Sequence, residues 1–454
     1  MKKYLPLTAV LLASIYFYAP TTSWAQEKYM ELQNFSKILN LVQQYYVEPT
    51  DSKKLIEGAI KGMLRELDPH TNYMPAEIFK EFESETAGQF GGIGIEISIQ
   101  NGVLTIISPI EDTPAYKAGI KPGDKVVAIN GQSTKGFSLI EASALLKGKN
   151  GDAVTLTVVR DKSDKPIDIV IVRGQVKVKS IKPTNLDPGF VFIRITSFIE
   201  TTSDDLSAAL EKFKKDNNGK IEGILIDLRR NPGGLLDQAV KVSDMFLKDG
   251  AIVSTMGRDP KSKEVSYASK KAPYGDVPIV ILINEFSASA SEIVSGALQD
   301  NKRAIIVGEK SFGKGSVQSV IKLGDGSGLK LTVARYYTPS GVSIQSEGIT
   351  PDIEIEDIDS DILVKSLNER KGLREKDISG HLKSDKEKAQ EKTGKGKKEK
   401  PSVADADSSV AWWRDIGSLD NASLTPKQKL FRTDYQAYQA YSYLKAWKTL
   451  KNLK

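Results

Sequence analysis

Three serines at alternate positions, Ser287, Ser289 and Ser291, lie in the stretch NEFSASASE, between an apolar run and a helical pattern. The helix is expected to begin near Ala290, so the serines fall in a strand-to-helix turn. Ser289 and Glu292 match the capping box S-x-x-E, in which the serine oxygen bonds free N–H groups of the helix. The same place lies at the positive end of the helix dipole, where a developing oxyanion is stabilised. The position therefore permits either a structural cap or a nucleophile.

Few residues could act as the base that activates such a serine, because the chain holds two histidines and no cysteine. His381 lies in a lysine-rich tract, and His70 follows the turn marked by Asp68 and Pro69, where a structural role is more typical than catalysis. A Ser-His-Asp triad would need His70 as its base. Thiol chemistry and zinc sites built from several His or Cys ligands are excluded. A reactive serine would otherwise need a carboxylate or an amine.

One amine candidate is Lys314, which lies 25 residues after Ser289 in the stretch GEKSFGKGSVQ. A lysine between glycines is most often a solvated turn residue. The stretch from Gly308 to Lys314 also reads G-x-x-x-x-G-K, which is close to a phosphate-binding P-loop. That motif needs Ser or Thr next and then a helix, whereas Gly315 follows here and VQSVIKL is typical of a strand. The spacing therefore disfavours nucleotide binding.

The elements that must position these residues alternate between strands and helices. Apolar strands are predicted at FVFIRITSF, IEGILIDL, AIVSTMG, PIVILIN and AIIVG, and amphipathic helices at SDDLSAALEKFKKD, LLDQAVKVSDMFL and SEIVSGALQDN. Such alternation predicts a layered α/β domain. Chemistry in these sheets gathers where strands lead into helices, which is where the serines lie.

Two further regions precede this domain. Residues 28–85 carry apolar residues at spacings of three and four, which predicts two helices, the second capped by Asp51. From Gly91 to about Arg173 the pattern changes to five short strands with Asn-Gly and Pro-Gly turns, interrupted by the short helices TPAYKAG and SLIEASALLKG. This second pattern predicts a small, partly open barrel.

The N-terminus, MKKYLPLTAVLLASIYFYAPTTSWAQ, has two lysines, an apolar run and a small-residue ending. It predicts a secretory signal that is cleaved after Ala25. The apolar run, from Leu5 to Tyr18, has 14 residues and is short for a bilayer span, so an uncleaved anchor is the weaker interpretation. The mature chain is therefore expected to be exported, in the periplasm or another extracytoplasmic compartment.

The net charge of +6 is concentrated in two places, with +2 in residues 1–25 and +5 in residues 371–400. The remainder is close to neutral, which is not the footprint of a nucleic-acid-binding domain. Residues 354–425 lose periodicity, and their composition predicts a flexible linker, with binding to anionic lipid as the alternative. A helix, capped by Thr425, is predicted over TPKQKLFRTDYQAYQAYSYLKAWKTL.

The barrel-like region resembles a PDZ domain. The resemblance rests on GGIGIEI, SPIEDTPAYKAGIKPGDKVVAINGQS and LLKGKNGDAVTLTVVR. It implies that Gly92, Ile93, Gly94 and Ile95 form the loop whose N–H groups hold a peptide's terminal carboxylate. The adjacent strand edge would accept the peptide as an added strand. A barrel that only packs is the alternative.

Residues 28–357 resemble the C-terminal processing, or tail-specific, serine proteases, which use a Ser/Lys dyad. The matching stretches are LDPHT, LIDLRRNPGGLL, NEFSASASEIVSGALQDNKRAIIVGEKSFGKGSVQ and YYTPSGVSIQSEGITPDI. The resemblance implies Ser289 as nucleophile, Lys314 as general base and Gln318 as the residue that orients the lysine. Ser287 and Ser291 become loop and first-turn residues.

The implied chemistry has a physical requirement. Lys314 must be neutral near pH 7, and lowering a lysine pKa from about 10.4 to about 7.5 costs roughly 4 kcal/mol, which burial can supply. The amide oxygen of Gln318 can accept a hydrogen bond from the amine. The oxyanion hole is expected to combine the N–H of Ala290 with that of Gly233 or Gly234, which otherwise belong to an ordinary Pro-Gly turn.

We therefore expect a mixed α/β fold: a ClpP/crotonase-like protease core, as the resemblance implies, with an inserted PDZ domain and helical ends. The expected function is an exported serine endopeptidase that needs no cofactor or metal and recognises C-terminal regions of proteins. PDZ gating, an oligomer formed by the terminal helices and an adaptor partner stay open. The expected segments are a signal peptide (1–25), an N-terminal helical region (26–88), the PDZ domain (89–175), the catalytic domain (176–357), a basic linker (358–424) and a C-terminal helix (425–454).

Two other classes of function remain open. In the first, the chain is a PDZ scaffold or chaperone with an inert catalytic-like domain, against which the full set of dyad residues argues. In the second, a nucleotide enzyme uses residues 308–314, but the chain shows no partner motif with a magnesium carboxylate.

Overall fold

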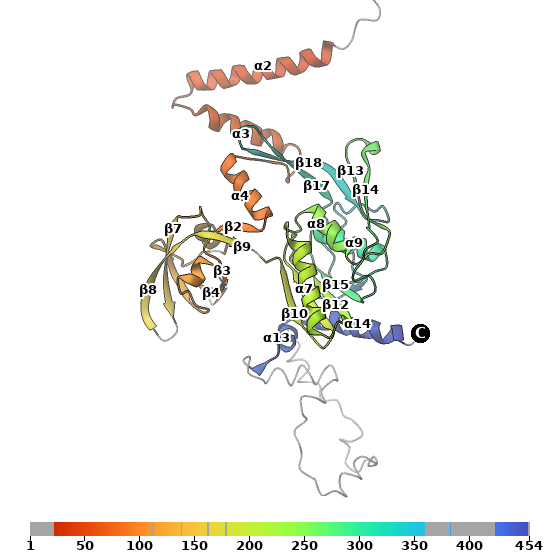
Figure 1. The fold of residues 1–454 in the computed structure, drawn as a ribbon. Coiled ribbons are helices and arrows are strands. Elements are labelled where there is room, and N and C mark those ends of the chain that lie inside the picture. The colour runs from red at the N-terminus through yellow and green to blue at the C-terminus, as the bar shows by residue number, and fades with distance from the viewer. Residues whose placement is uncertain are drawn as a thin grey trace, which may run out of the picture. The chain divides into compact units, whose positions relative to one another are not determined.

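The computed structural model describes residues 22–358, except 101, 111, 112, 138, 161, 162 and 178, together with residues 382 and 423–452 (Figure 1). The predicted signal peptide up to residue 21, His381 and nearly all of the predicted linker lie outside the described residues. The chain forms two compact units, Met1–Pro75 with Val320–Thr332, and Ala76–Ser319 with Val333–Lys454. Within the described part, no helix is both long and apolar enough to span a membrane.

The smaller unit holds the two predicted N-terminal helices, α2 (Thr22–Tyr45) and α3 (Ser52–Arg65). Asp51 caps α3, since its carboxylate accepts from the backbone N–H groups of Lys53 and Lys54, as the sequence predicts. A short strand, β1 (Asn72–Met74), pairs antiparallel with the beginning of β18 (Gly328–Tyr337). A third helix, α4 (Ala76–Thr86), belongs to the larger unit.

The break that contains His70 is a tight side-chain-supported turn. The Asp68 carboxylate accepts from the N–H of His70 at 2.8 Å and from the N–H of Thr71 at 2.9 Å. Burial raises the pKa of Asp68, but these bonds and one from the Thr71 hydroxyl outweigh it, so the pKa lies below its usual value. The turn is thus held by its own backbone donors.

The PDZ-like region forms one antiparallel sheet in the order β3-β4-β5-β7-β8, with β6 beside β5. Its entry and exit strands, β2 and β9, pair with each other. Ile106, Val126 and Leu156 are fully buried at its centre. The elements are β2 (Gln89–Gly92), β3 (Ile95–Gln100), β4 (Val103–Pro109), α5 (Pro114–Lys117), β5 (Lys125–Ile129), β6 (Gln132–Ser133), α6 (Leu139–Leu146), β7 (Ala153–Arg160), β8 (Ser163–Val172) and β9 (Gly174–Lys177).

The central sheet of the catalytic region has the order β10-β11-β12-β15-β16-β19. Only β10 runs antiparallel to its neighbour, and the other pairs are parallel. The apolar runs of β12 and β15 are buried at every position, as expected of parallel strands covered on both faces. The strands are β10 (Ile181–Asn185), β11 (Phe190–Ile195), β12 (Gly223–Asp227), β15 (Ile279–Ile283), β16 (Ile305–Gly308) and β19 (Ile353–Glu354).

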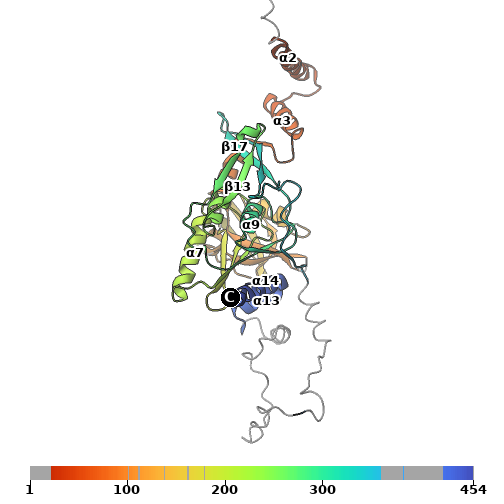
Figure 2. The ribbon, with the colours of Figure 1, turned by 90° about the vertical axis from the view of Figure 1, so that its right-hand side faces the viewer.

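Helices cover both faces of this sheet. One face, with Ile193, Ile226 and Ile281, packs in a single core with α7 (Thr202–Asp216), α8 (Leu236–Asp244) and α9 (Ala290–Asp300). The alternate residues, such as Leu225 and Leu282, pack with the C-terminal helices, which are blue in Figures 1 and 2. The strands and helices that the sequence predicts to alternate thus form a layered α/β core.

A second sheet joins β13 (Ala251–Met256) to β14 (Glu264–Tyr267) on one side and to β18 on the other. A short 3-10 helix, η1 (Pro260–Ser262), connects β13 to β14. All but the last residue of the stretch VQSVIKL lies in β17 (Ser316–Lys322), which also pairs with β18. The segment after the near P-loop is therefore a strand, as the sequence predicts, and not the helix that a P-loop requires.

The prediction of one C-terminal helix is wrong, because the structure has two. The first, α13 (Pro426–Thr433), begins at the predicted cap Thr425, and the second, α14 (Tyr435–Asn452), follows directly. Asp434 separates them with a non-helical backbone, φ −136° and ψ 89°. Its carboxylate accepts from the N–H of Ala437 at 2.8 Å, so Asp434 caps α14 instead of continuing α13.

The same aspartate ties the C-terminal helices to the sheet. The guanidinium of Arg229 donates to Asp434 at 2.9 Å and to the fully buried Asp227, also at 2.9 Å. Burial lowers the pKa of Arg229, but the two carboxylates outweigh it and raise the pKa above its ordinary value. The guanidinium therefore stays charged between two carboxylates.

Removing this cation is expected to destabilise the fold. Arg229→Ala removes the guanidinium that pairs with the buried Asp227 and leaves the more distant guanidinium of Arg194 at 3.9 Å, and breaking a buried pair in this way costs about 3–5 kcal/mol. We expect a fall of that size in the free energy of unfolding, measured by urea denaturation. Lys241→Ala, which breaks an exposed pair with Asp237, is the control and should change that free energy by less than about 0.5 kcal/mol. Equal effects of the two variants would contradict a structural role for the Arg229 network.

Candidate active site

Ser289 lies in the turn between β15 and α9, directly before the first residue of the helix. Its backbone has φ 53° and ψ −111°, a conformation that is costly for a residue with a side chain. A serine on a sharp, strained strand-to-helix turn is also found at the nucleophile elbow of α/β-hydrolases. Its side chain is 8% exposed. This backbone geometry is compatible with a nucleophile, and the catalytic role of Ser289 stays a prediction.

The two neighbouring serines have structural hydrogen bonds. The hydroxyl of Ser287 donates to the carbonyl of Leu228 at 2.9 Å and accepts from the N–H of Asn284. The hydroxyl of Ser291 donates to the carbonyl of Asn231 at 3.0 Å. Both side chains are fully buried. Ser287 and Ser291 therefore hold the turn against the segment after β12, in line with the loop and first-turn places expected for them.

The loop that carries Lys314 is bonded to this turn. It connects β16 to β17, and the N–H of Phe312 donates to the carbonyl of Ser287 at 3.0 Å. The N–H of Lys314 donates to the carboxylate of Glu292 at 2.9 Å, and the same carboxylate oxygen accepts from the N–H of Ser289 at 2.7 Å. The backbones of the two predicted dyad residues are thus held by one carboxylate.

Glu292 is the buried acceptor at this junction, and the sequence predicts only its capping role. Its other oxygen accepts from the hydroxyl of Ser311 and from the N–H of Gly313, both at 2.6 Å. Burial raises the pKa of Glu292, and the hydrogen bonds from Ser311, Gly313, Ser289 and Lys314 offset only part of that rise. No local sequence signal could reveal the contacts to residues 311–314, because they come from a distant loop.

Tyr336 is a second contact of Ser289 that sequence reasoning missed. Tyr336 is buried, the Ser289 side chain influences the pKa of its phenol, and its N–H donates to the carbonyl of Gly315 at 2.7 Å. Burial raises the pKa of the phenol to about 12, against the opposing effect of Ser289. Tyr336 is therefore a neutral phenol at neutral pH. The stretch YYTPSG, which belongs to the family resemblance, was the available signal.

The predicted oxyanion-hole segment lies beside the nucleophile turn. A Cβ atom added to Gly233 would lie 2.8 Å from Cβ of Ser289 and 2.9 Å from the nitrogen of Ala290. The N–H of Gly233 donates to the side chain of Asn231 at 2.9 Å. A Cβ added to Gly234 would lie 2.1 Å from a backbone carbonyl oxygen, so that position is also closely packed. Which N–H groups receive the oxyanion stays a prediction.

Gln318 lies in β17, four residues after Lys314. Its amide nitrogen donates to the hydroxyl of Ser316 at 2.8 Å and to the Ser316 carbonyl at 3.3 Å. These bonds fix the plane of the amide, and its orienting effect on the lysine stays a prediction.

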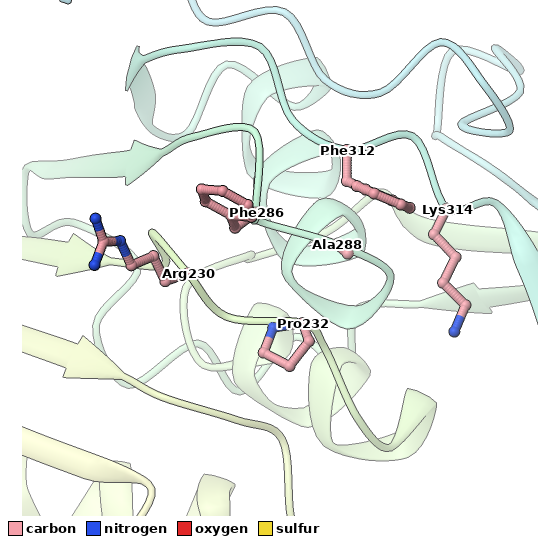
Figure 3. A pocket seen from close by; sticks show the side chains of 6 residues that line it. All are labelled: Arg230, Pro232, Phe286, Ala288, Phe312 and Lys314. Carbon is pink, nitrogen blue, oxygen red and sulfur yellow. The ribbon is translucent and has the colours of Figure 1, made fainter. Parts of the chain in front are cut away.

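An open cavity of about 620 Å³ adjoins the nucleophile turn. Figure 3 shows Phe286 and Phe312 on two loops, with Arg230 and Lys314 toward opposite ends. Both aromatic side chains are more than half exposed, and exposed apolar side chains that gather at one place mark binding surfaces. The cavity is lined by Arg230, Pro232, Phe286, Ala288, Phe312 and Lys314. It therefore offers an apolar surface next to the predicted dyad.

The predicted carboxylate-binding loop of the PDZ region is partly turned inward. The Ile93 side chain is 2% exposed in the domain core, and its carbonyl accepts from the N–H of Ala115 at 2.8 Å. The Gly94 carbonyl accepts from the Thr113 hydroxyl at 3.0 Å, and a Cβ at Gly94 would lie 2.4 Å from that side chain. Gly92 ends β2 and Ile95 begins β3. Peptide binding by these four residues stays a prediction.

Within the described ranges, no cluster of three or more His, Cys, Asp or Glu side chains could hold a metal ion. The described residues therefore offer no candidate metal centre.

Three protein families match the sequence. Peptidase family S41 matches residues 189–355, the PDZ domain matches residues 105–160, and the activating protease CtpB N-terminal domain matches residues 18–78. The S41 match falls in the catalytic region, the PDZ match in the PDZ-like region and the CtpB match in the N-terminal helical region.

Relatives that match most of the chain include bacterial processing proteases. The carboxy-terminal-processing protease of Bartonella bacilliformis is 46% identical over 377 residues, which cover 81% of this chain and 84% of the relative. The carboxy-terminal processing protease CtpA of Bacillus subtilis is 38% identical over 327 residues, covering 72% and 69%. Among solved structures, the photosystem II D1 C-terminal processing protease is 30% identical, with coverage of 71% and 92% and a TM-score of 0.44. The chain therefore belongs to peptidase family S41, as a serine protease of the carboxy-terminal processing group that carries a PDZ domain.

Proposed function

We propose that this chain is an exported endopeptidase that cleaves peptide bonds through an acyl-enzyme formed on Ser289, with Lys314 as the general base. One observation carries the proposal. The loop with Lys314 is bonded to the nucleophile turn both directly, by Phe312, and through the Glu292 carboxylate. This arrangement supports a dyad, because the backbones of the nucleophile and the amine are held at one place.

In the first half of the reaction, the hydroxyl oxygen of Ser289 attacks the scissile carbonyl carbon, and its proton passes to the amine of Lys314. The carbonyl oxygen becomes an oxyanion, which accepts from the N–H of Ala290 and from an N–H of Gly233 or Gly234. The C–N bond then breaks, and the leaving amine takes the proton from Lys314. The N-terminal part of the substrate remains as an ester on Ser289.

In the second half, water attacks the ester carbonyl and Lys314 accepts a proton from it. The Ser289 ester bond breaks, the serine oxygen recovers a proton from Lys314, and a new carboxylate terminus is released. Gln318 orients the amine throughout. The apolar cavity between Phe286 and Phe312 is suited to an uncharged side chain of the substrate beside the cleaved bond.

We further propose that the PDZ domain captures the free C-terminus of the substrate with residues 92–95. A charge-assisted hydrogen bond to a carboxylate contributes about 1.5–3 kcal/mol. A tagged peptide with an amidated C-terminus is therefore expected to show KM raised by about tenfold or more, with kcat nearly unchanged. The measurement is steady-state kinetics on paired peptides.

The matched control for this experiment is acetylation of the same peptide at its N-terminus. That change also removes a terminal charge, but it should leave KM unchanged. Equal KM values for the free and the amidated C-terminus would contradict recognition of the terminal carboxylate.

Export and assembly are also proposals. The signal-like residues 1–25 support an extracytoplasmic, periplasmic location. Oligomerisation through the N-terminal helices is supported by large apolar side chains that are exposed on α2, since exposed apolar patches mark interaction surfaces. These side chains are Tyr29, Met30, Leu32, Phe35, Ile38, Leu41 and Tyr45. An adaptor partner stays open.

The proposed function is tested by digestion of a C-terminally tagged peptide with the wild type and with Ser289→Ala and Lys314→Ala. The inert scaffold is the second candidate, and it predicts tight binding of the peptide without cleavage by the wild type. A requirement for ATP would favour the nucleotide enzyme instead.

A further inference from the structure

The proposed chemistry does not use the buried carboxyl group of Glu292. Glu292 is fully buried, and four hydrogen bonds end on its two carboxylate oxygens. One oxygen accepts from the N–H groups of Ser289 and Lys314, and the other accepts from the hydroxyl of Ser311 and the N–H of Gly313. A residue that only capped α9 would need the bond from the N–H of Ser289 and none of the other three.

The four donors indicate the protonation state of the Glu292 carboxyl group. Three of them are backbone N–H groups, which cannot reverse to become acceptors. A protonated carboxyl would have to direct its own hydrogen into this set of donors, with the Ser311 hydroxyl as the one partner able to turn. The geometry is therefore that of a carboxylate anion that accepts at every position.

The donors also come from two separate segments. Ser289 belongs to the nucleophile turn, whereas Ser311, Gly313 and Lys314 belong to the loop between β16 and β17. Glu292 itself lies in the first turn of α9. One rigid side chain thus fixes the backbone positions of both predicted dyad residues relative to the same helix.

We propose that Glu292 is a positioning residue that sets the distance and orientation between Ser289 and Lys314. The inference rests on the proposed dyad and adds a residue that acts through both of its members. Proton transfer requires heavy atoms within hydrogen-bond reach, and a displacement of about 1 Å can cost about a hundredfold in rate. Loss of this carboxylate should therefore slow acylation without weakening substrate binding.

The test uses Glu292→Gln in the full chain, because glutamine keeps the size and shape of the side chain. It offers one acceptor oxygen, while its NH2 group faces two of the former donors. We expect kcat to fall by about tenfold to a hundredfold, with KM within about twofold of the wild type. The rate of Ser289 labelling by a fluorophosphonate probe should fall by a similar factor, because labelling also needs the activated serine.

Complete labelling by the same probe counts the active sites and separates positioning from folding. A purely structural role would lower the fraction of titratable sites and leave the rate per titrated site unchanged. Glu285→Gln is the control, because Glu285 is an exposed carboxylate in the same turn outside this set of contacts, and it should keep the wild-type rate. A kcat per titrated site within about twofold of the wild type in Glu292→Gln would overturn the inference.

The outcome is distinguishable from failure of the proposed function. If the wild type cleaves and neither Ser289→Ala nor Lys314→Ala does, the dyad stands whatever Glu292→Gln does. If Ser289→Ala cleaves as well as the wild type, the proposed function fails and the positioning role fails with it.

Discussion

Replacing Ser289 by alanine is expected to abolish cleavage of a tagged peptide, with kcat reduced by about ten-thousandfold or more. The variant keeps the residues that line the cavity but has no atom that can form the acyl-enzyme. KM, where it can be measured, should stay close to the wild-type value, because binding depends on other surfaces. The measurement is product formation over long incubation, resolved by mass spectrometry.

Lys314→Ala should give a loss of similar size, because the hydroxyl then has no base within the dyad. The double variant should lose little more than either single variant, since residues that act as one unit have non-additive effects. Lys314→Arg should not restore the rate, because a guanidinium stays protonated near neutral pH and cannot accept the serine proton. Recovery of activity in the arginine variant would contradict the role of a neutral amine.

The matched control for these variants is Lys310→Ala. Lys310 is an exposed lysine in the same loop, four residues before Lys314, and its removal should leave the rate unchanged. Cleavage that survives in Ser289→Ala would show that the nucleophile is assigned to the wrong residue. Binding without cleavage by the wild type would favour the scaffold.

Much of the fold follows from local patterns in the sequence. The run PIVILIN becomes the buried strand β15, and the capping pair Ser289 and Glu292 marks the beginning of α9. Both are short-range signals, since apolar periodicity and capping depend on residues within one or two turns. The strand-to-helix turn that places Ser289 can therefore be predicted from a short stretch of residues.

The parts that could not be predicted depend on contacts between distant segments. The C-terminal pattern is helical on both sides of Asp434, whose carboxylate caps α14 and also accepts from the distant Arg229. Likewise, the sequence shows Glu292 as a cap but gives no sign that residues 311–314 will donate to it. Periodicity reports which face of an element is buried, and it does not report which loop will cover it.

The predicted oxyanion-hole segment, NPGG, is less clearly defined by the sequence than the turn that carries Ser289. The stretch NPGG reads equally well as an ordinary turn, and only the structure shows how closely Gly233 approaches the nucleophile turn. A Cβ atom there would lie 2.7 Å from the Ala288 carbonyl oxygen and 2.8 Å from Cβ of Ser289. A glycine is required at this position for space as well as for its positive φ of 101°.

Gly233→Ala is therefore expected to reduce kcat by about a hundredfold to a thousandfold, the range measured when one oxyanion-hole donor is lost. The contacts of the added methyl group include backbone atoms of Ala288 and Ala290, which cannot move away as a flexible side chain could. Relief of the clash must shift either the predicted oxyanion segment, which contains Gly233, or the strained turn of Ser289. Either shift moves donors away from the developing oxyanion, whereas KM should change little.

The control must carry the same backbone strain without the clash. Gly219 also has a positive φ, 77°, and an added Cβ atom would meet nothing within 4 Å. Gly219→Ala should lower the free energy of unfolding by about 1–2 kcal/mol, as expected for an L residue in the left-handed region, and leave kcat within about twofold of the wild type. Equal kcat values for the two variants, each normalised to titrated active sites, would contradict the placement of Gly233 against the reacting centre. A selective loss in Gly233→Ala would instead tie the catalytic rate to the closeness of these two backbone segments.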